Sequence, residues 1–162
     1  MTRKAAKLTH VAPDGAARMV DVSGKPETVR TARARGCIRM TKDALEAIRS
    51  QQIAKGDVLS VARVAGIMAA KKTSDLIPLC HPLMIEDVEV DLAPDADLPG
   101  VRVTTQVRST GRTGVEMEAL VAATVALVTV YDMVKSADRS MVIGDISLIS
   151  KTGGQRGTYI AD

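Results

Sequence analysis

The chain has 162 residues, the size of one domain, and 46% of them are hydrophobic, so it can bury a core without metal or disulfide bonds. Its net charge of +3 is too small to predict a nucleic-acid partner, which ordinarily needs a concentrated basic surface, but it suits a small anionic substrate. Two cysteines and no apolar run of roughly 18 residues argue against a disulfide framework and a membrane span, and favour a soluble, cytoplasmic protein with no membrane partner.

The first half of the chain predicts an arm, a strand and two helices. Residues 1–19 form a loose N-terminal arm without the apolar stretch of a signal peptide. Alternating residues from Thr28 to Met40 predict a long strand with Gly36 as its candidate bulge. Thr41 can cap a short extra helix through about residue 52, and a largely buried helix is expected over 57–71. The segment 73–82 contains two prolines and cannot be regular throughout.

The second half predicts strands over 84–92 and 101–109, a long helix over 115–137, a strand over 142–149 and a flexible, glycine-rich C-terminal tail over 151–162. Thr113 and Glu116 have the spacing of a capping box for the long helix. Leaving aside the short helix, the order is strand, helix, strand, strand, helix, strand. This order predicts a single α+β domain of the ferredoxin-like type, with helices packed on one face of an antiparallel sheet.

The segment around Cys80-His81-Pro82 is the first candidate for chemistry. Histidine transfers protons near neutral pH, and a histidine beside proline in irregular backbone is well placed for presentation to a ligand. The spacing equally allows a hydrogen-bonded structural histidine. A zinc site is not expected, because His10, His81, Cys37 and Cys80 lack paired ligand spacing.

Asp132 and Lys135 are the second candidate, three residues apart near the end of an otherwise apolar helix. They are either a surface ion pair or an acid–base pair in which the ammonium tunes the carboxylate. Several further cations can bind an anion or simply occupy helix ends and turns. These are Lys55, Lys71, Arg112 in the turn before the long helix, and Lys151 and Arg156 in the glycine-rich tail.

The length of the long helix limits how its acidic residues can cooperate. Glu118 and Asp132 are 14 residues apart, which is about 21 Å along a helix axis. If both line one small-molecule site, they must come from two copies of the helix. The site would then lie between subunits.

Several long stretches, in this order, resemble one known family over nearly the whole chain, from Leu8 to about Gly157. They include 19–23, 55–58, 65–71, Leu76-Ile77-Pro78-Leu79-Cys80-His81-Pro82-Leu83, 113–120 and Tyr131-Asp132-Met133. The family is that of the cyclic pyranopterin monophosphate synthases, protein C of molybdenum-cofactor biosynthesis.

The resemblance implies a lyase whose substrate is the 3′,8-cyclised dihydro-GTP. The family rearranges it to a pterin, closes a cyclic phosphate and releases pyrophosphate. It needs no redox cofactor, and Mg²⁺ is allowed as a companion of the triphosphate. The resemblance also implies a homohexamer, a trimer of dimers with the active site at the dimer interface. The small net charge, as noted above, predicts no nucleic-acid partner.

Residue by residue, the resemblance implies catalytic roles for Asp132, Lys135, Lys55 and His81. It implies substrate contacts from Leu79, Cys80, His81, Met117 and Glu118, and we add Lys71, Lys151 and Arg30 as triphosphate ligands. Val134 and Thr152 depart from the cysteine and serine expected there, and neither change removes a titrating catalytic group. The competing hypothesis is a catalytically inert nucleotide-binding or assembly module on the same scaffold, because that fold hosts many functions.

Overall fold

A computed structural model describes residues 15–155 and 157–161. Its helices and strands are, in chain order, β1 (Thr28–Arg39), α1 (Lys42–Arg49), α2 (Val58–Ala70), α3 (Thr73–Leu76), β2 (Asp87–Asp95), β3 (Gly100–Gly111), α4 (Glu116–Val134), β4 (Val142–Thr152) and β5 (Tyr159–Ile160). The predicted order of long elements is confirmed. The one-turn helix α3 and the short strand β5 were not predicted.

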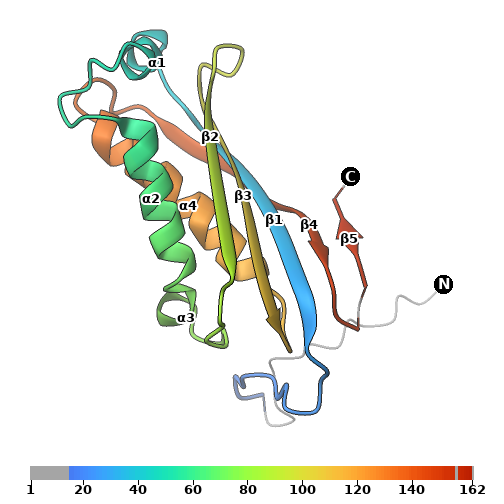
Figure 1. Ribbon diagram of the computed structural model, residues 1–162. Helices are drawn as coiled ribbons and strands as arrows, with labels where there is room; N and C mark the ends of the chain where they lie inside the picture. Colours follow the sequence, from blue (N-terminus) through green and yellow to red (C-terminus); the bar gives the residue numbers. More distant parts are fainter. Residues whose placement is uncertain (1–14, 156, 162) are drawn as a thin grey trace.

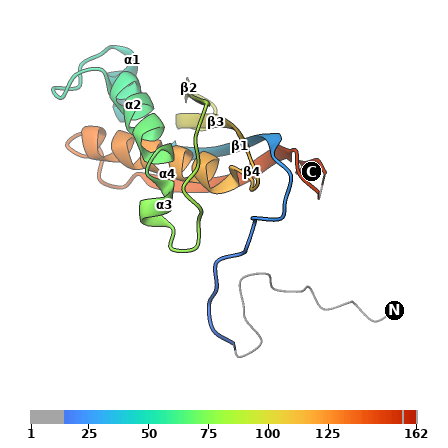
Figure 2. The ribbon, with the colours of Figure 1, turned by 60° about the horizontal axis from the view of Figure 1, so that its bottom comes forward.

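The strands form one antiparallel sheet in the order β2-β3-β1-β4-β5. The two long helices, α2 and α4, lie against each other on one face of this sheet (Figures 1 and 2). The predicted α+β, ferredoxin-like arrangement is therefore confirmed. Central strand β1 pairs with β3 in unbroken register along its whole length, which makes it the rigid axis of the sheet.

The predicted cap of α1 is confirmed, the cap of α2 was not predicted, and the start of α4 differs from its prediction. The Thr41 hydroxyl accepts from the Ala44 N–H at the start of α1, and the Asp57 carboxylate accepts from the Ser60 N–H at the start of α2. The capping box predicted for α4 is wrong: Val115 is the N-cap and no side chain caps the helix. The carboxylate of Glu116 instead folds back over Gly114, in space that a Cβ at this position would overlap.

Helix α4 is the centre of the core. Its buried face is built from small residues, and Ala119, Ala122, Ala123 and Ala126 are fully inaccessible. With a mean hydropathy of 1.7, α4 is long and apolar enough to cross a membrane by composition alone, contrary to our expectation that no segment reaches that threshold. Half of that helix window is buried inside the domain, so its hydropathy is explained by core packing.

The bulge predicted at Gly36 is wrong, because the irregularities lie in the partner strand β4. Between Arg35 and Cys37, β1 advances two residues while β4 advances three, from Ser147 to Gly144. Asp145 within this bulge has a φ of +55°. Gly36 is required for close packing: a Cβ there would lie 2.9 Å from Cδ1 of Leu127 and 3.0 Å from Cγ1 of Ile146.

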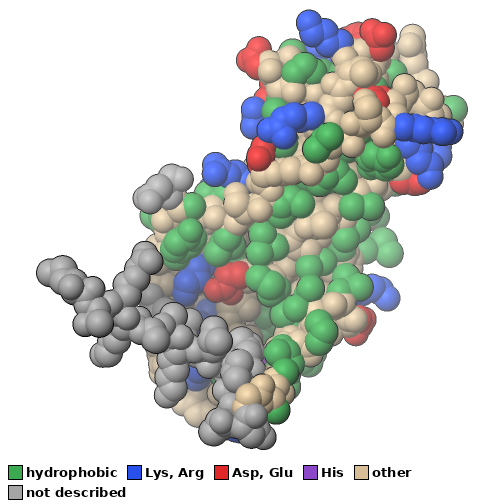
Figure 3. Space-filling view, turned by 180° about the vertical axis from the view of Figure 1, so that it is seen from behind, with side chains coloured by type: hydrophobic (Ala, Val, Ile, Leu, Met, Phe, Trp, Pro, Cys, Tyr) green, Lys and Arg blue, Asp and Glu red, His purple; other side chains and the backbone are tan. Residues whose placement is uncertain are grey.

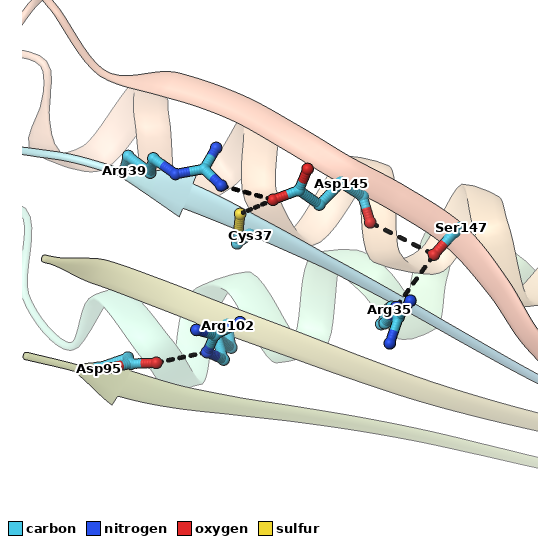
Figure 4. A network of polar contacts seen from close by, with 7 residues as sticks. All are labelled: Arg35, Cys37, Arg39, Asp95, Arg102, Asp145 and Ser147. Carbon is cyan, nitrogen blue, oxygen red and sulfur yellow. Dashed lines mark hydrogen bonds and ion pairs between the residues drawn. The ribbon is translucent and has the colours of Figure 1, made fainter. Parts of the chain in front are cut away.

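The bulge turns the Asp145 carboxylate onto β1 (Figure 4). Its Oδ2 accepts from Arg39 Nη2 at 2.6 Å and from the buried Cys37 thiol at 3.3 Å. Burial and this carboxylate raise the pKa of the Cys37 thiol, so the group stays protonated and acts as a hydrogen-bond donor. The network joins β1 to β4 where their register is interrupted.

The C-terminal segment extends the sheet further than predicted. Lys151 and Thr152, assigned above to a flexible tail, belong to β4, and Tyr159 of β5 pairs with Lys151. Backbone pairing on both sides of Lys151 gives this cation a defined position. Most of the predicted N-terminal arm, residues 1–14, and Arg156 lie outside the described residues.

We predict that Gly36→Ala destabilises the protein by about 1–2 kcal/mol, because the added methyl group overpacks the contact between β1, α4 and β4. Replacing glycine by alanine in a strand ordinarily stabilises the folded protein, so a net decrease in stability would be due to the packing effect. The measurement is the free energy of unfolding in guanidinium chloride. Gly24→Ala is the control, because a Cβ at Gly24 has no neighbour within 4 Å. Equal stability of the two variants would contradict the prediction.

Candidate active site

Helix α4 carries one group of candidate residues at each end. Asp132 and Lys135 lie at its C-terminal end with Lys55, from the loop before α2. Met117 and Glu118 lie in its first turn, beside the segment that contains His81. The structure therefore gathers these candidate residues into two clusters, one at each end of α4. Most of the length of the helix separates the two clusters.

The Asp132 carboxylate lies between two ammonium groups. Its Oδ2 accepts from Lys55 Nζ at 2.8 Å and its Oδ1 pairs with Lys135 Nζ at 2.7 Å. Lys55 also donates to the Asp132 backbone carbonyl at 2.7 Å, so its position is fixed by two acceptors. Hydrogen bonds from Lys135 and Lys55 lower the pKa of Asp132 to about 2. Asp132 is thus ionised at neutral pH and orients both lysines.

A cavity of about 310 Å³ opens beside this pair. It is lined by Lys55, Tyr131, Lys135, Ser136 and Arg139. The loop that supplies the last two residues is held by buried Asp138, whose carboxylate accepts from the Thr41 N–H at 2.8 Å and from the Ser140 N–H at 2.8 Å. The cavity is therefore lined by three cations, of which Arg139 comes from this firmly attached loop.

A larger cavity, of about 560 Å³, lies at the other end of α4. Irregular segments around residues 20–25 and 79–83, the start of α4 and the end of β4 enclose it. Seven of the predicted site residues line it: Arg30, Leu79, Cys80, His81, Met117, Glu118 and Lys151. Burial and the charges of Glu118 and Glu116 raise the pKa of the Cys80 thiol, which favours its protonated, weakly nucleophilic form.

Arg30 is the most enclosed cation of this larger cavity, with 8% of its surface exposed. Its Nε donates to the Gly111 carbonyl at 3.2 Å, and within the described chain no carboxylate pairs with it. Gly153 and Gly154, both at positive φ, form a turn over it, and a Cβ at Gly154 would overlap the guanidinium. A buried guanidinium that has no counter-ion in the described part of the chain is suited to pairing with an anion.

Two further cations line the larger cavity: Lys25, which the sequence did not single out, and Arg112, which was named above as a possible anion ligand but not assigned to the site. Lys25 lines it from the irregular segment before β1, where no periodic pattern marks a single lysine. Arg112 lines it from the turn before α4, and its guanidinium reaches back to the Ser23 carbonyl at 3.2 Å. The position of Arg112 before a helix start is the signal that had suggested an anion contact. Lys71, predicted to bind the triphosphate, lines neither cavity.

The segments that line the two cavities fall within the part of the chain that is similar to known proteins. The MoaC family model matches residues 19–154, which includes both ends of α4 and every predicted site residue. The chain belongs to the MoaC family. It is 60% identical over 157 residues, covering 97% of this chain and 98% of the relative, to a cyclic pyranopterin monophosphate synthase of Methylobacterium sp. (strain 4-46). It is 57% identical over 155 residues, covering 96% and 98%, to the synthase of Dinoroseobacter shibae.

The family segment at the start of α4 contains Glu118, a carboxyl group whose pKa differs strongly from that of Asp132. Glu118 is 4% exposed, and burial, with a smaller contribution from the charge of Glu116, raises its pKa to about 7. A carboxyl group with a pKa near 7 exchanges protons efficiently at neutral pH, whereas one near 2 does not. Glu118 is therefore better suited than Asp132 to acid–base chemistry.

We predict that the raised pKa of Glu118 makes the protein less stable as pH rises from about 4.5 to about 7. Across this range the unfolded carboxyl group loses its proton while the folded one keeps it, so ionisation favours the unfolded state by at most about 3 kcal/mol. Above pH 7 both forms are ionised and the loss is complete.

Glu118→Gln, neutral at every pH, should lack this decrease. The measurement is guanidinium chloride unfolding at pH 5 and pH 8 and fixed protein concentration, with the exposed Glu46→Gln as control. Wild-type and Glu118→Gln proteins with the same change in stability between the two pH values would show that Glu118 titrates normally.

Proposed function

We propose that this protein is a lyase that converts (8S)-3′,8-cyclo-7,8-dihydroguanosine 5′-triphosphate into cyclic pyranopterin monophosphate and pyrophosphate, in the cytoplasm. The observation that carries the proposal is the 60% identity, over nearly the full length of both chains, to a protein named cyclic pyranopterin monophosphate synthase. The site supports it, because both cavities are lined by cations suited to a triphosphate.

In this mechanism the cations of both cavities share the phosphate groups of the substrate, and the Asp132 group also acts on the rings. Positive charge in the larger cavity comes from Arg30, Lys151, Arg112 and Lys25. Lys55 and Lys135, held by Asp132, donate and accept protons as the purine five-membered ring opens and the pterin forms. His81 and Glu118 exchange protons at the ribose or base.

The rearrangement is internal to the substrate, so we propose that it requires no resident cofactor. The described residues contain no group of three His, Cys, Asp or Glu side chains arranged to hold a metal ion. A Mg²⁺ ion would enter bound to the triphosphate.

We further propose that the active site forms between two subunits of a homohexamer, a trimer of dimers. Glu118, Val125 and Asp132 are spaced by seven residues, so they lie along one side of α4 with Val125 midway. A two-fold axis beside Val125 would place Glu118 of each subunit near Asp132 of the partner, joining the two half-sites.

The outer surface of the helical layer suits this contact. Exposed apolar side chains lie on α2 (Val61, Val64, Met68) and on α4 (Met117, Val128). Hydrophobic side chains extend down the middle of the face over α4, while charged ones gather at its upper end (Figure 3). A patch of this kind on a monomer indicates a protein–protein contact.

The function is tested by mixing the protein with the cyclised substrate and measuring pyrophosphate and an oxidisable fluorescent pterin. We predict that Asp132→Asn lowers kcat by about two orders of magnitude or more, because the neutral amide no longer anchors two ammonium groups. KM should change much less.

Asp43→Asn is the matched control, an exposed aspartate in the first turn of α1, and should keep wild-type turnover. A wild-type protein that binds the substrate without forming either product would favour the inert nucleotide-binding module. Near-wild-type turnover by Asp132→Asn would exclude a role for this carboxylate in the chemistry.

The shared site predicts recovery of activity in mixtures of inactive variants. Glu118→Ala and Asp132→Asn should each be nearly inactive alone. In a mixed dimer one site carries both substitutions and the other is wholly native. Random pairing at equal amounts makes half of the dimers mixed, so about a quarter of all sites should regain activity.

Subunit exchange is verified by native mass spectrometry with one variant isotopically labelled, and turnover is measured before and after exchange. Verified mixed dimers without recovered turnover would place both residues in the site of one subunit.

A further inference from the structure

We propose that Arg139 binds a phosphate group of the substrate or of the released pyrophosphate, as the third cation of the cavity beside Asp132. This inference rests on the proposed function and adds a residue to which no role has been assigned above. The guanidinium lines the same cavity as Lys55 and Lys135, and it reaches that cavity from the loop that follows α4.

The charge of the cavity is the first argument. Lys55, Lys135 and Arg139 contribute three positive charges, and Asp132 contributes one negative charge, so the group carries a net charge of +2. Both oxygens of Asp132 are already occupied by the lysines. Arg139 is left without an ion pair in the described part of the chain. Excess positive charge that faces a cavity favours an anionic ligand.

The second argument is that contacts fix the backbone of Arg139, while its guanidinium forms no ion pair with any described residue. The Tyr131 hydroxyl donates to the Arg139 carbonyl at 3.2 Å. The neighbouring Asp138 carboxylate accepts from the Ser140 hydroxyl at 2.6 Å and from the Thr41 N–H at 2.8 Å. These contacts hold residue 139 at the rim of the cavity through main-chain atoms. Replacing its side chain leaves each of them intact.

The third argument concerns the chemistry of the ligand. A guanidinium presents a planar pair of donors that matches two phosphate oxygens, whereas an ammonium is a point charge. The Asp132 carboxylate already pairs with the ammonium groups of Lys55 and Lys135. Arg139 has no ion pair in the described part of the chain, so its guanidinium is the cation of this cavity best suited to a bidentate contact with phosphate.

The test compares Arg139→Gln, Arg139→Lys and the control Arg49→Gln, a solvent-exposed arginine in the last turn of α1. Steady-state kinetics give KM, kcat and the inhibition constant for added pyrophosphate. Titration calorimetry with pyrophosphate measures binding without turnover. Melting temperature and sedimentation velocity report on fold and assembly.

We expect Arg139→Gln to raise KM about ten- to hundredfold, with kcat lowered several-fold at most, because a charge-assisted hydrogen bond is lost. Arg139→Lys should fall between Arg139→Gln and wild type, and Arg49→Gln should match wild type. If the inhibition constant and the dissociation constant for pyrophosphate rise together with KM, Arg139 contacts the phosphates that are released. A rise in KM alone assigns it to the phosphate that the product retains.

Unchanged KM and pyrophosphate binding in Arg139→Gln would overturn the proposal, as would an equal effect in Arg49→Gln. If both Arg139 variants lose turnover and also sediment as smaller assemblies than the wild-type protein, Arg139 would be an assembly contact instead. If the wild-type protein forms no product, the proposed function fails, yet the calorimetric comparison still decides whether Arg139 binds pyrophosphate.

Discussion

The close contact between α4 and the sheet is the constraint on which the rest of the structure depends. In the absence of Phe and Trp, the contact is made by alanines on α4 and by Gly36 on β1, where a methyl group would meet Leu127 and Ile146. Small side chains let helix and sheet approach closely, and packing of native density resists both gaps and excess volume. The helix is consequently a rigid spacer with a cluster of reactive groups at each end.

Both ends of α4 are lined by cations, but they place their carboxyl groups in opposite environments. Asp132 is exposed between two ammonium groups and has a pKa of about 2, while Glu118 is buried and has a pKa of about 7. Carboxyl groups whose environments drive their pKa values apart are suited to different tasks at one pH. In the proposed enzyme the first fixes cations, and the second exchanges protons.

The long elements were predictable from the sequence because their signals are periodic. The alternation from Thr28 and the apolar pattern after Val115 marked β1 and α4, and the helical rise predicted the separation of Glu118 from Asp132. The errors occurred where tertiary contacts override local rules. Thr113 has capping spacing but leaves α4 uncapped, and the register shift opposite Gly36 lies in β4. Lys25 and Arg139 occur in irregular segments, where only the folded structure shows that they line a cavity.

The scarcity of aromatic residues provides a spectroscopic reporter. The chain has two tyrosines and no tryptophan, and one of the tyrosines, Tyr131, lines the cavity beside Lys55 and Lys135. Its hydroxyl contacts the loop that carries Arg139. One of the two tyrosine chromophores of the chain therefore lies within the candidate site, so ligand binding or loop movement can be followed without a label. The weak protein background also leaves the emission of an oxidised pterin readable during turnover.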